Sequence, residues 1–284
     1  MSDSSSDRPE FGNIYLGDTY DTPENTPHAL GDRLCCGGRW YFYWHNFNIF
    51  RITGNLGKAG KLTREDQIRL STGNMRLVEA CGGRIHLRGL DNLRAMRQQP
   101  AVLLGNHMSL LETALFHAFL RAHMDFTFVI KPSLMKIPFF RDIMVALDAI
   151  VISRDNPRQD LKTVLEEGKR RLDAGRSVII FPQGTRSTDF DPEKFSSIGT
   201  KLAKSSGYPI LPFALKTDFL QNGRYLRDLG PIKRDADVWF EFAPARPVTG
   251  NGREQQQEVI DFIADRLARW KKGDADRAAS GKSF

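Results

Sequence analysis

The chain of 284 residues carries 41 Lys and Arg against 34 Asp and Glu, and 40% of its residues are hydrophobic. That apolar fraction supports a packed core and excludes wholesale disorder, and the length suits one large domain or two small ones. The net charge of +7 favours anionic partners such as phosphate groups, anionic lipid or nucleic acid.

Membrane-spanning, exported and disulfide-stapled proteins fit the sequence poorly. No stretch approaches the roughly 20 mostly apolar residues of a spanning helix, and the polar start MSDSSSDRPE lacks the features of a signal peptide. Cys35, Cys36 and Cys81 cannot all pair within the chain and have no zinc-ligand spacing. We therefore expect a cytosolic protein without a disulfide framework, a metal or a cofactor.

The two ends of the chain differ in composition from its middle. Residues 1–30 and 273–284 are polar and lack hydrophobic periodicity, which predicts a disordered or extended first tail and a polar last one. Residues 31–81 lack strand signals and are expected to form two helices, with contact to a membrane as one option. Residues 82–272 are expected to form the main domain.

The main domain alternates strand and helix signals. Runs rich in β-branched or aromatic residues predict strands at Ile85–Leu87, Ala101–Leu104, Phe126–Ile130, Ala149–Ser153, Ser177–Phe181, Ile210–Ala214 and Val238–Phe242. Helical patterns begin near Ser109 and at Asn156-Pro157, where Leu161, Leu165 and Leu172 form the apolar stripe, and a last one carries Val259, Ile263, Leu267 and Trp270. This alternation predicts an α/β fold with a mixed sheet flanked by helices.

The segment Gly105–Glu112 contains the most informative polar residues. His107 follows a predicted strand, and Ser109 with Glu112 forms a Ser-x-x-Glu capping box at the start of a helix. In one interpretation Glu112 bonds back to the Ser109 N–H and caps the helix. In the other, its carboxylate reaches the imidazole of His107 just before the helix and leaves the second ring nitrogen as a base.

Two further loops follow predicted strands and carry arginine. In Phe181–Ser187, Gly184 permits close backbone approach to an anion, and Arg186 offers a planar fork suited to phosphate oxygens. Arg154 ends the strand before, so two arginines are expected to converge above one edge of the sheet. The alternative is a turn with solvated surface charges.

Together these segments resemble the lysophospholipid and glycerol-phosphate acyltransferase family, whose marks are four short boxes in a fixed order. The family has Asn-His-x4-Asp, a strand ending in Arg, Phe-Pro-Glu-Gly-Thr-Arg-Ser, and Val-Pro-Ile-x-Pro. The matching segments here are Asn106-His107 with Glu112, Ile152-Ser153-Arg154, Phe181–Ser187 and Tyr208–Pro212. Lys131–Phe139 is similar to the link between the first two boxes, and the resemblance extends from about Arg84 to Lys216.

The resemblance implies a glycerol-phosphate acyltransferase-like fold over 82–272 and assigns a role to each matching residue. His107 is the general base and Glu112 orients it, in place of the usual Asp. The implied substrate-binding residues are Lys131, Arg154, Gln183, Gly184, Thr185 and Arg186. Gln183 replaces the family's Glu, which leaves the identity of the acceptor open.

The resemblance also implies an activity. A fatty acyl group passes from acyl-CoA or acyl carrier protein to the hydroxyl of a lysophospholipid, with lysophosphatidic acid the first expectation and no covalent intermediate. Another lyso-lipid, for example an amino-acid-containing one, and a non-catalytic lipid-binding protein are the alternatives; nucleic acid is not an expected partner. The aromatic run Trp40–His45 between Arg39 and Arg51 favours peripheral contact with the anionic inner face of the cell membrane, and the alternative is that these aromatics pack on the sheet.

Overall fold

The computed structural model of the protein describes residues 17–35, 38–224, 228–234 and 236–279. Its strands are β1 (Tyr20–Asp21), β2 (Ile85–Arg88), β3 (Val102–Gly105), β4 (Asp125–Ile130), β5 (Ile150–Val151), β6 (Arg176–Ile180), β7 (Ile210–Lys216) and β8 (Val238–Phe242). Its α-helices are α1 (Leu30–Leu34), α2 (Trp40–Lys58), α3 (Arg64–Ala80), α4 (Leu90–Ala95), α5 (Leu111–Phe119), α6 (Phe140–Ala146), α7 (Pro157–Asp173), α8 (Ile198–Ser206) and α9 (Arg253–Ala279). Short 3-10 turns occur at η2 (Pro132–Lys136) and η3 (Pro192–Lys194).

The strands form one mixed sheet of eight in the order β1-β2-β8-β7-β3-β6-β4-β5. The run from β7 to β5 is parallel, whereas β8 is antiparallel to β7 and β1 is antiparallel to β2. Every residue of β3 and β7 is buried, as expected of central strands with both faces covered. The predicted α/β class with a mixed, helix-flanked sheet is confirmed.

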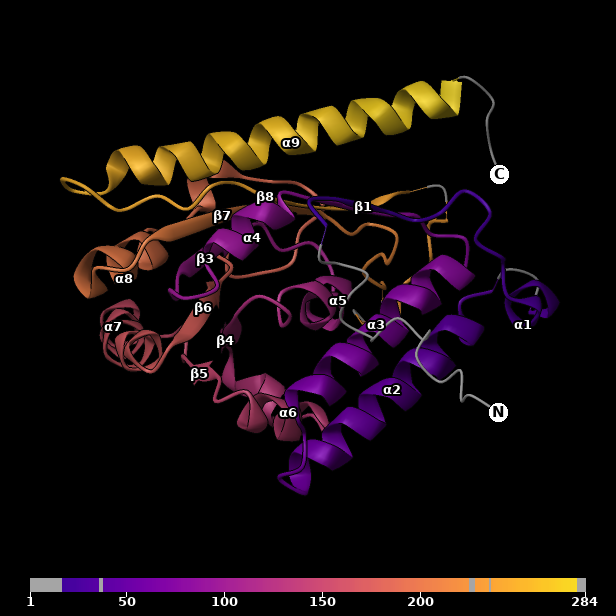
Figure 1. The fold of residues 1–284 in the computed structure, drawn as a ribbon, viewed down its shortest axis with the longest axis horizontal. Helices are drawn as coiled ribbons and strands as arrows, with labels where there is room; N and C mark the ends of the chain where they lie inside the picture. The colour runs from indigo at the N-terminus through magenta and orange to yellow at the C-terminus, as the bar shows by residue number, and fades with distance from the viewer. Residues whose placement is uncertain (1–16, 36–37, 225–227, 235, 280–284) are drawn as a thin grey trace, which may run out of the picture.

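The helices cover both sides of the curved sheet (Figure 1). On one side α7 contacts β6, α8 contacts β3, and the long α9 lies along β7. On the other side α5 packs on α3, α3 on α2, and α2 on α6. Helix α5 directly follows β3 in the chain, and His107 lies in the loop between them. This loop therefore leads from the sheet onto the second side.

The predicted strands are all present. Of the helices, α2 and α3 match the two expected within residues 31–81, and the short α1 is an additional helix at the start of this region. One apolar stripe differs from the expectation. On α7 the buried apolar positions are Val164, Gly168 and Leu172, whereas Leu161 and Leu165 are only half-buried. A side chain on Gly168 would meet Leu202 of α8 at 2.7 Å, so the close approach of α8 sets which face of α7 is buried.

Structure extends into both segments expected to be tails. At the start, Tyr20 and Asp21 pair with β2 as an edge strand, and residues 1–16 lie outside the described ranges. At the end, α9 continues past Gly273 to Ala279. Trp270 is 7% exposed, and Asp274 makes a 2.6 Å ion pair with Lys216 of β7, so packing and charge hold this polar stretch as helix.

Three observations bear on membranes, thiols and metals. Within the described ranges, no helix combines the length and apolar character needed to cross a membrane. Cys35 is an exposed free thiol and Cys81 a buried one, whereas Cys36 lies outside the described residues. Among the residues that the structure describes, no three His, Cys, Asp or Glu side chains form a group that could hold a metal ion.

Candidate active site

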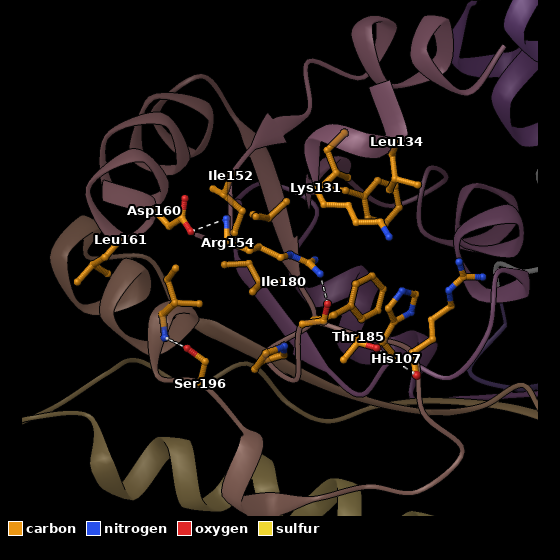
Figure 2. Close-up of a pocket in the computed structure, with 18 of the residues that line it drawn as sticks. His107, Lys131, Leu134, Ile152, Arg154, Asp160, Leu161, Ile180, Thr185 and Ser196 are labelled. Atoms are coloured by element: carbon orange, nitrogen blue, oxygen red, sulfur yellow. Dashed lines mark hydrogen bonds between the residues drawn. The ribbon is translucent and has the colours of Figure 1, made fainter. Parts of the chain in front are cut away.

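A cleft of about 410 Å³ opens where the parallel strands end. Its wall includes His107 after β3, Lys131 after β4, Arg154 after β5 and Phe181 after β6. Figure 2 shows His107, Lys131, Arg154 and Thr185 around one space. The carboxyl ends of parallel strands are where an open α/β sheet binds ligands, so the topology brings these segments together.

His107 is fixed on both sides by its neighbours. The Asn106 side chain exchanges two hydrogen bonds with the backbone of Leu215 on β7, at 2.8 and 2.9 Å, and so anchors the loop at the end of β3. The imidazole of His107 stacks on the ring of Phe181, with 4.1 Å between centroids and 17° between planes. The Ser187 N–H donates to the His107 carbonyl at 2.9 Å. The ring therefore lies in the cleft wall in one orientation.

Glu112 lies behind His107 and is fully buried. Its Oε1 accepts from His107 Nδ1 at 2.7 Å, and also from the N–H groups of Met108 at 2.7 Å and Ser109 at 3.0 Å. Both interpretations of Ser109-x-x-Glu112 are thus partly realised. However, α5 begins at Leu111 rather than Ser109, because the Ser109 hydroxyl accepts from the Leu111 N–H, at 3.1 Å, and not from that of Glu112.

The second carboxylate oxygen of Glu112 is held by a residue that sequence reasoning missed. Thr217, directly after β7, donates its hydroxyl to Glu112 Oε2 at 2.6 Å, and the Ser109 hydroxyl lies 2.9 Å from that of Thr217. The available signal was that Thr217 follows the strand of the fourth box, which pairs with β3. A lone Thr at such a position is too common to stand out.

These contacts decide the charge of Glu112. Burial raises the pKa of its carboxyl group, but the hydrogen bonds from His107, Thr217 and the Met108 N–H outweigh burial and hold the pKa below its ordinary value of 4.5. The group is therefore a carboxylate at neutral pH. It can hold the Nδ1 proton of His107 and stabilise an imidazolium.

Arg154, which also lines the cleft, has a strained backbone. Its φ is 67°, in the left-handed region that non-glycine residues rarely adopt. Buried Asp160 supports this conformation by accepting from the backbone N–H groups of Arg154 at 2.7 Å and Ser153 at 2.9 Å. The guanidinium donates to the carbonyl of Gly184, which links the two arginine-bearing loops.

The loop after β6 turns at Gly184, whose φ of 70° explains the glycine. The N–H of Gly184 closes that turn onto the Phe181 carbonyl at 2.9 Å, so this N–H is not the one offered to an anion. Arg186 and Thr185 line the cleft, and Arg186 makes a 2.5 Å ion pair with Asp228, which sequence reasoning also missed.

The remaining predicted site residues, Lys131 and Gln183, differ in position. Lys131 lines the cleft, and within the described ranges its side chain has no hydrogen bond or ion pair. Gln183 lies in the same loop as Gly184 but is not part of the cleft wall. The cleft thus combines a histidine backed by a carboxylate with the cationic side chains of Lys131, Arg154 and Arg186 in one wall. Such a site can accept a proton and bind an anion.

Comparisons with known proteins agree with this arrangement. A family model described as Acyltransferase matches residues 84–216. The 1-acyl-sn-glycerol-3-phosphate acyltransferase of Pseudomonas aeruginosa is 33% identical over 191 residues, which are 66% of this chain and 70% of that protein. The enzyme of the same name from Borreliella burgdorferi is 28% identical over 188 residues, 66% of this chain and 72% of the relative.

A solved structure shares the fold. The crystal structure of the 1-acyl-sn-glycerophosphate acyltransferase PlsC from Thermotoga maritima superposes with a TM-score of 0.64, at 19% identity, over 85% of this chain and 97% of the other. At that identity the likeness shows the fold alone, whereas the family model covers the segments that carry His107, Arg154 and Arg186. The chain therefore belongs to the acyltransferase family, as its four sequence boxes predicted.

Proposed function

We propose that the protein transfers a fatty acyl group from an acyl thioester to the hydroxyl of lysophosphatidic acid and so forms phosphatidic acid. One observation carries the proposal: a single cleft is lined by His107, which is paired with Glu112, and by Lys131, Arg154 and Arg186. The names of the relatives from Pseudomonas and Borreliella support the same acceptor.

His107 acts on the acceptor hydroxyl. Because its Nδ1 is bonded to Glu112, Nε2 is the ring nitrogen that meets the substrate. Nε2 takes the hydroxyl proton while the hydroxyl oxygen attacks the thioester carbonyl, the C–S bond breaks, and the departing sulfur takes the proton back from the imidazolium. Glu112 stabilises the imidazolium between these transfers, and no acyl-enzyme forms.

The cationic side chains of the cleft bind the acceptor phosphate. Arg186 supplies a planar fork suited to two phosphate oxygens, and Lys131 supplies a mobile point charge. Asp160 is the one acidic side chain in the described wall of the cleft, and it is engaged by backbone N–H groups. A cationic head group therefore meets no available carboxylate. Since Gln183 is not part of the wall, its change from Glu does not alter the charge that lines the cleft.

The substrate is a lipid, so we propose that the enzyme docks on the inner face of an anionic membrane through α2. Trp40, Trp44 and Phe47 are 63%, 67% and 51% exposed and lie on one stripe of that helix. The aromatic run is not all surface, however: Phe42 and Tyr43 are core residues, and buried Tyr43 donates to the Gly230 carbonyl at 2.9 Å. The docking surface is thus narrower than the sequence suggests.

One experiment tests the acceptor and the donor together. Purified protein is offered lysophosphatidic acid, a zwitterionic lysophospholipid and an amino-acid-containing lyso-lipid, each with acyl-CoA and with acyl carrier protein, and the lipid products are identified by mass spectrometry. We expect phosphatidic acid as the main product. Preferred acylation of another lyso-lipid contradicts the acceptor assignment, and no transfer with any pair contradicts the activity.

A further inference from the structure

A second, smaller cavity of about 80 Å³ lies among α2, α3, α5 and α6. Thr113 of α5 with Phe140 and Met144 of α6 border both this cavity and the active-site cleft. A flexible methionine side chain adapts readily to what lies beside it. The cleft and the second cavity are therefore neighbours, separated by the side chains of these three residues.

The described wall of this cavity is mostly apolar and contains no Asp, Glu, Lys or Arg. Its polar side chains are engaged elsewhere, with one exception. The engaged ones are Asn46 with Asn74, Thr53 with the Ile49 carbonyl, Gln67 with Arg121, Ser71 with the backbone of Ala114 and Ala118, and Thr113 with the Leu110 carbonyl. The exception is His117.

His117 is 9% exposed, and its Nδ1 is buried with no hydrogen-bond partner among the described residues. Burial, together with the nearby charge of Arg121, lowers the pKa of its imidazole well below 6.5. The ring is therefore neutral at physiological pH and offers one N–H donor and one nitrogen acceptor. Buried polar groups are rarely left unpaired, so this imidazole points to an occupant that carries a hydrogen-bonding group.

We propose that His117 recognises a hydroxyl group on a fatty acyl chain that passes from the cleft into this cavity. A chain suits apolar walls without charges, and a hydroxyl pairs with either nitrogen of a neutral imidazole. A water molecule takes about 30 Å³ in the liquid, so the cavity holds only a few atoms of the chain. The inference rests on the proposed acyltransferase function and adds a preference for oxygenated chains to it.

The hydroxylated chain has two possible sources, the thioester donor and the acceptor's own acyl group. The kinetic test has an arm for each: plain lysophosphatidic acid with donors that differ only in the position of one hydroxyl, and a plain donor with the matching hydroxylated acceptors. In each arm kcat/KM is compared with that of the unsubstituted chain. The variants are His117→Phe, which keeps a ring and removes both nitrogens, and His123→Phe as matched control.

His123 suits the control because it is also a buried histidine, 3% exposed, yet it does not line the cavity. The ratio of kcat/KM for the hydroxylated chain to kcat/KM for the plain chain is compared between the variants. For at least one hydroxyl position in one arm, we expect this ratio to be about tenfold or more higher in the wild type than in His117→Phe. His123→Phe should keep the wild-type ratio. Equal ratios in wild type and His117→Phe at every position overturn the inference and leave the acyltransferase function standing.

A binding measurement keeps the inference testable without turnover. In His107→Ala, a free long-chain fatty acid with the favoured hydroxyl should raise the melting temperature more than the plain fatty acid does. The added substitution His117→Phe should abolish that difference. If both fatty acids give the same shift while His117 is present, a water molecule rather than a chain hydroxyl is the partner of the imidazole, and the inference is overturned. Absence of acyl transfer with any substrate contradicts the proposed function instead.

Discussion

The catalytic base and the cationic groups of the cleft are built in different ways. At the base, fully buried Glu112 accepts hydrogen bonds from the imidazole of His107, the hydroxyl of Thr217 and two backbone N–H groups. Among the cationic groups, Arg186 is paired with Asp228, whose side chain is 46% exposed, and Arg154 is bonded to a backbone carbonyl. The base has a closed network, and the cationic groups have contacts that a ligand can exchange.

This difference follows from what each group must do. A general base needs one fixed orientation and a partner of constant charge, and the burial of Glu112 behind several donors provides both. An anion site must release product, so its arginines are better held by partners that a phosphate can replace. Substitutions at the base and its partners should therefore lower kcat, whereas those at the cationic groups should change the Michaelis constant for the acceptor.

The largest effect is expected at the base itself. His107→Ala should lower acyl transfer by about 10²–10⁴-fold, because general-base catalysis contributes about that factor. The fold should persist, so the circular dichroism spectrum of the variant should match that of the wild type. His45→Ala, at an exposed histidine of α2, is the control. Turnover within tenfold of wild type at equal folded fraction removes His107 from the mechanism.

Glu112→Gln should cost both activity and stability. The sequence alone predicts only the small loss of stability that accompanies a weakened helix cap. In the structure, however, hydrogen-bond donors surround this carboxylate. The NH2 group of a glutamine would therefore face N–H and O–H groups that have no acceptor there. We expect kcat to fall by about 10²-fold and the free energy of unfolding by about 1–3 kcal/mol at pH 7. Chemical denaturation and initial rates on the same preparation measure the two effects.

The same substitution makes a prediction about pH. Because the pKa of Glu112 is lower in the folded chain than its ordinary 4.5, the carboxylate stabilises the fold above about pH 4.5. That contribution is lost as the pH falls through the folded pKa. The gap in unfolding free energy between wild type and Glu112→Gln should therefore shrink below pH 4.5. A gap that stays constant down to pH 3 contradicts the charge assignment.

Thr217→Val tests whether the second carboxylate oxygen matters. Valine keeps the shape and removes the hydroxyl that donates to Glu112 at 2.6 Å. We expect about a tenfold fall in kcat with little change in the Michaelis constants, and recovery in Thr217→Ser, which restores the donor. If valine and serine behave alike, Thr217 contributes packing only.

In the Arg186–Asp228 ion pair, Arg186→Lys and Asp228→Asn should change the Michaelis constant for the acceptor in opposite directions. Lysine loses the two-pronged fork, so the Michaelis constant for lysophosphatidic acid should rise about tenfold while that for the donor stays constant. Asp228 lies 2.5 Å from Arg186 and competes with the phosphate for it. Asparagine removes that negative charge, so the Michaelis constant for lysophosphatidic acid should fall. Arg253→Lys, at the exposed start of α9, is the control. A rise in both variants means that the Arg186–Asp228 pair is structural.

The smallest effect on chemistry is expected at the docking surface. Trp40, Trp44 and Phe47 changed together to Ser should leave turnover of a dispersed short-chain substrate unchanged. Binding to anionic vesicles should lose its salt-resistant part, because buried apolar surface is insensitive to salt whereas attraction by Lys and Arg is screened within about 8–10 Å. Sedimentation at low and high salt measures both parts. Wild-type sedimentation of the folded variant at high salt contradicts docking through α2.

The sequence predicted the elements better than the contacts between them. Strands and the pair His107–Glu112 were predictable because hydrophobic periodicity and a spacing of five residues are local signals. Thr217 and Asp228 were not, because each reaches its partner from a distant segment and neither residue type stands out alone. The aromatic run on α2 was predicted as one surface, yet helical periodicity divides it between core and solvent.

One measurement tests the central claim most directly. Wild-type protein is mixed with an acyl thioester, with and without lysophosphatidic acid, and released thiol and phosphatidic acid are quantified in the same reaction. The account predicts that both appear in equal amounts, and only when the acceptor is present, because the His107-activated hydroxyl is the sole nucleophile. A burst of one equivalent of thiol without acceptor, or thiol release that never yields phosphatidic acid, contradicts it.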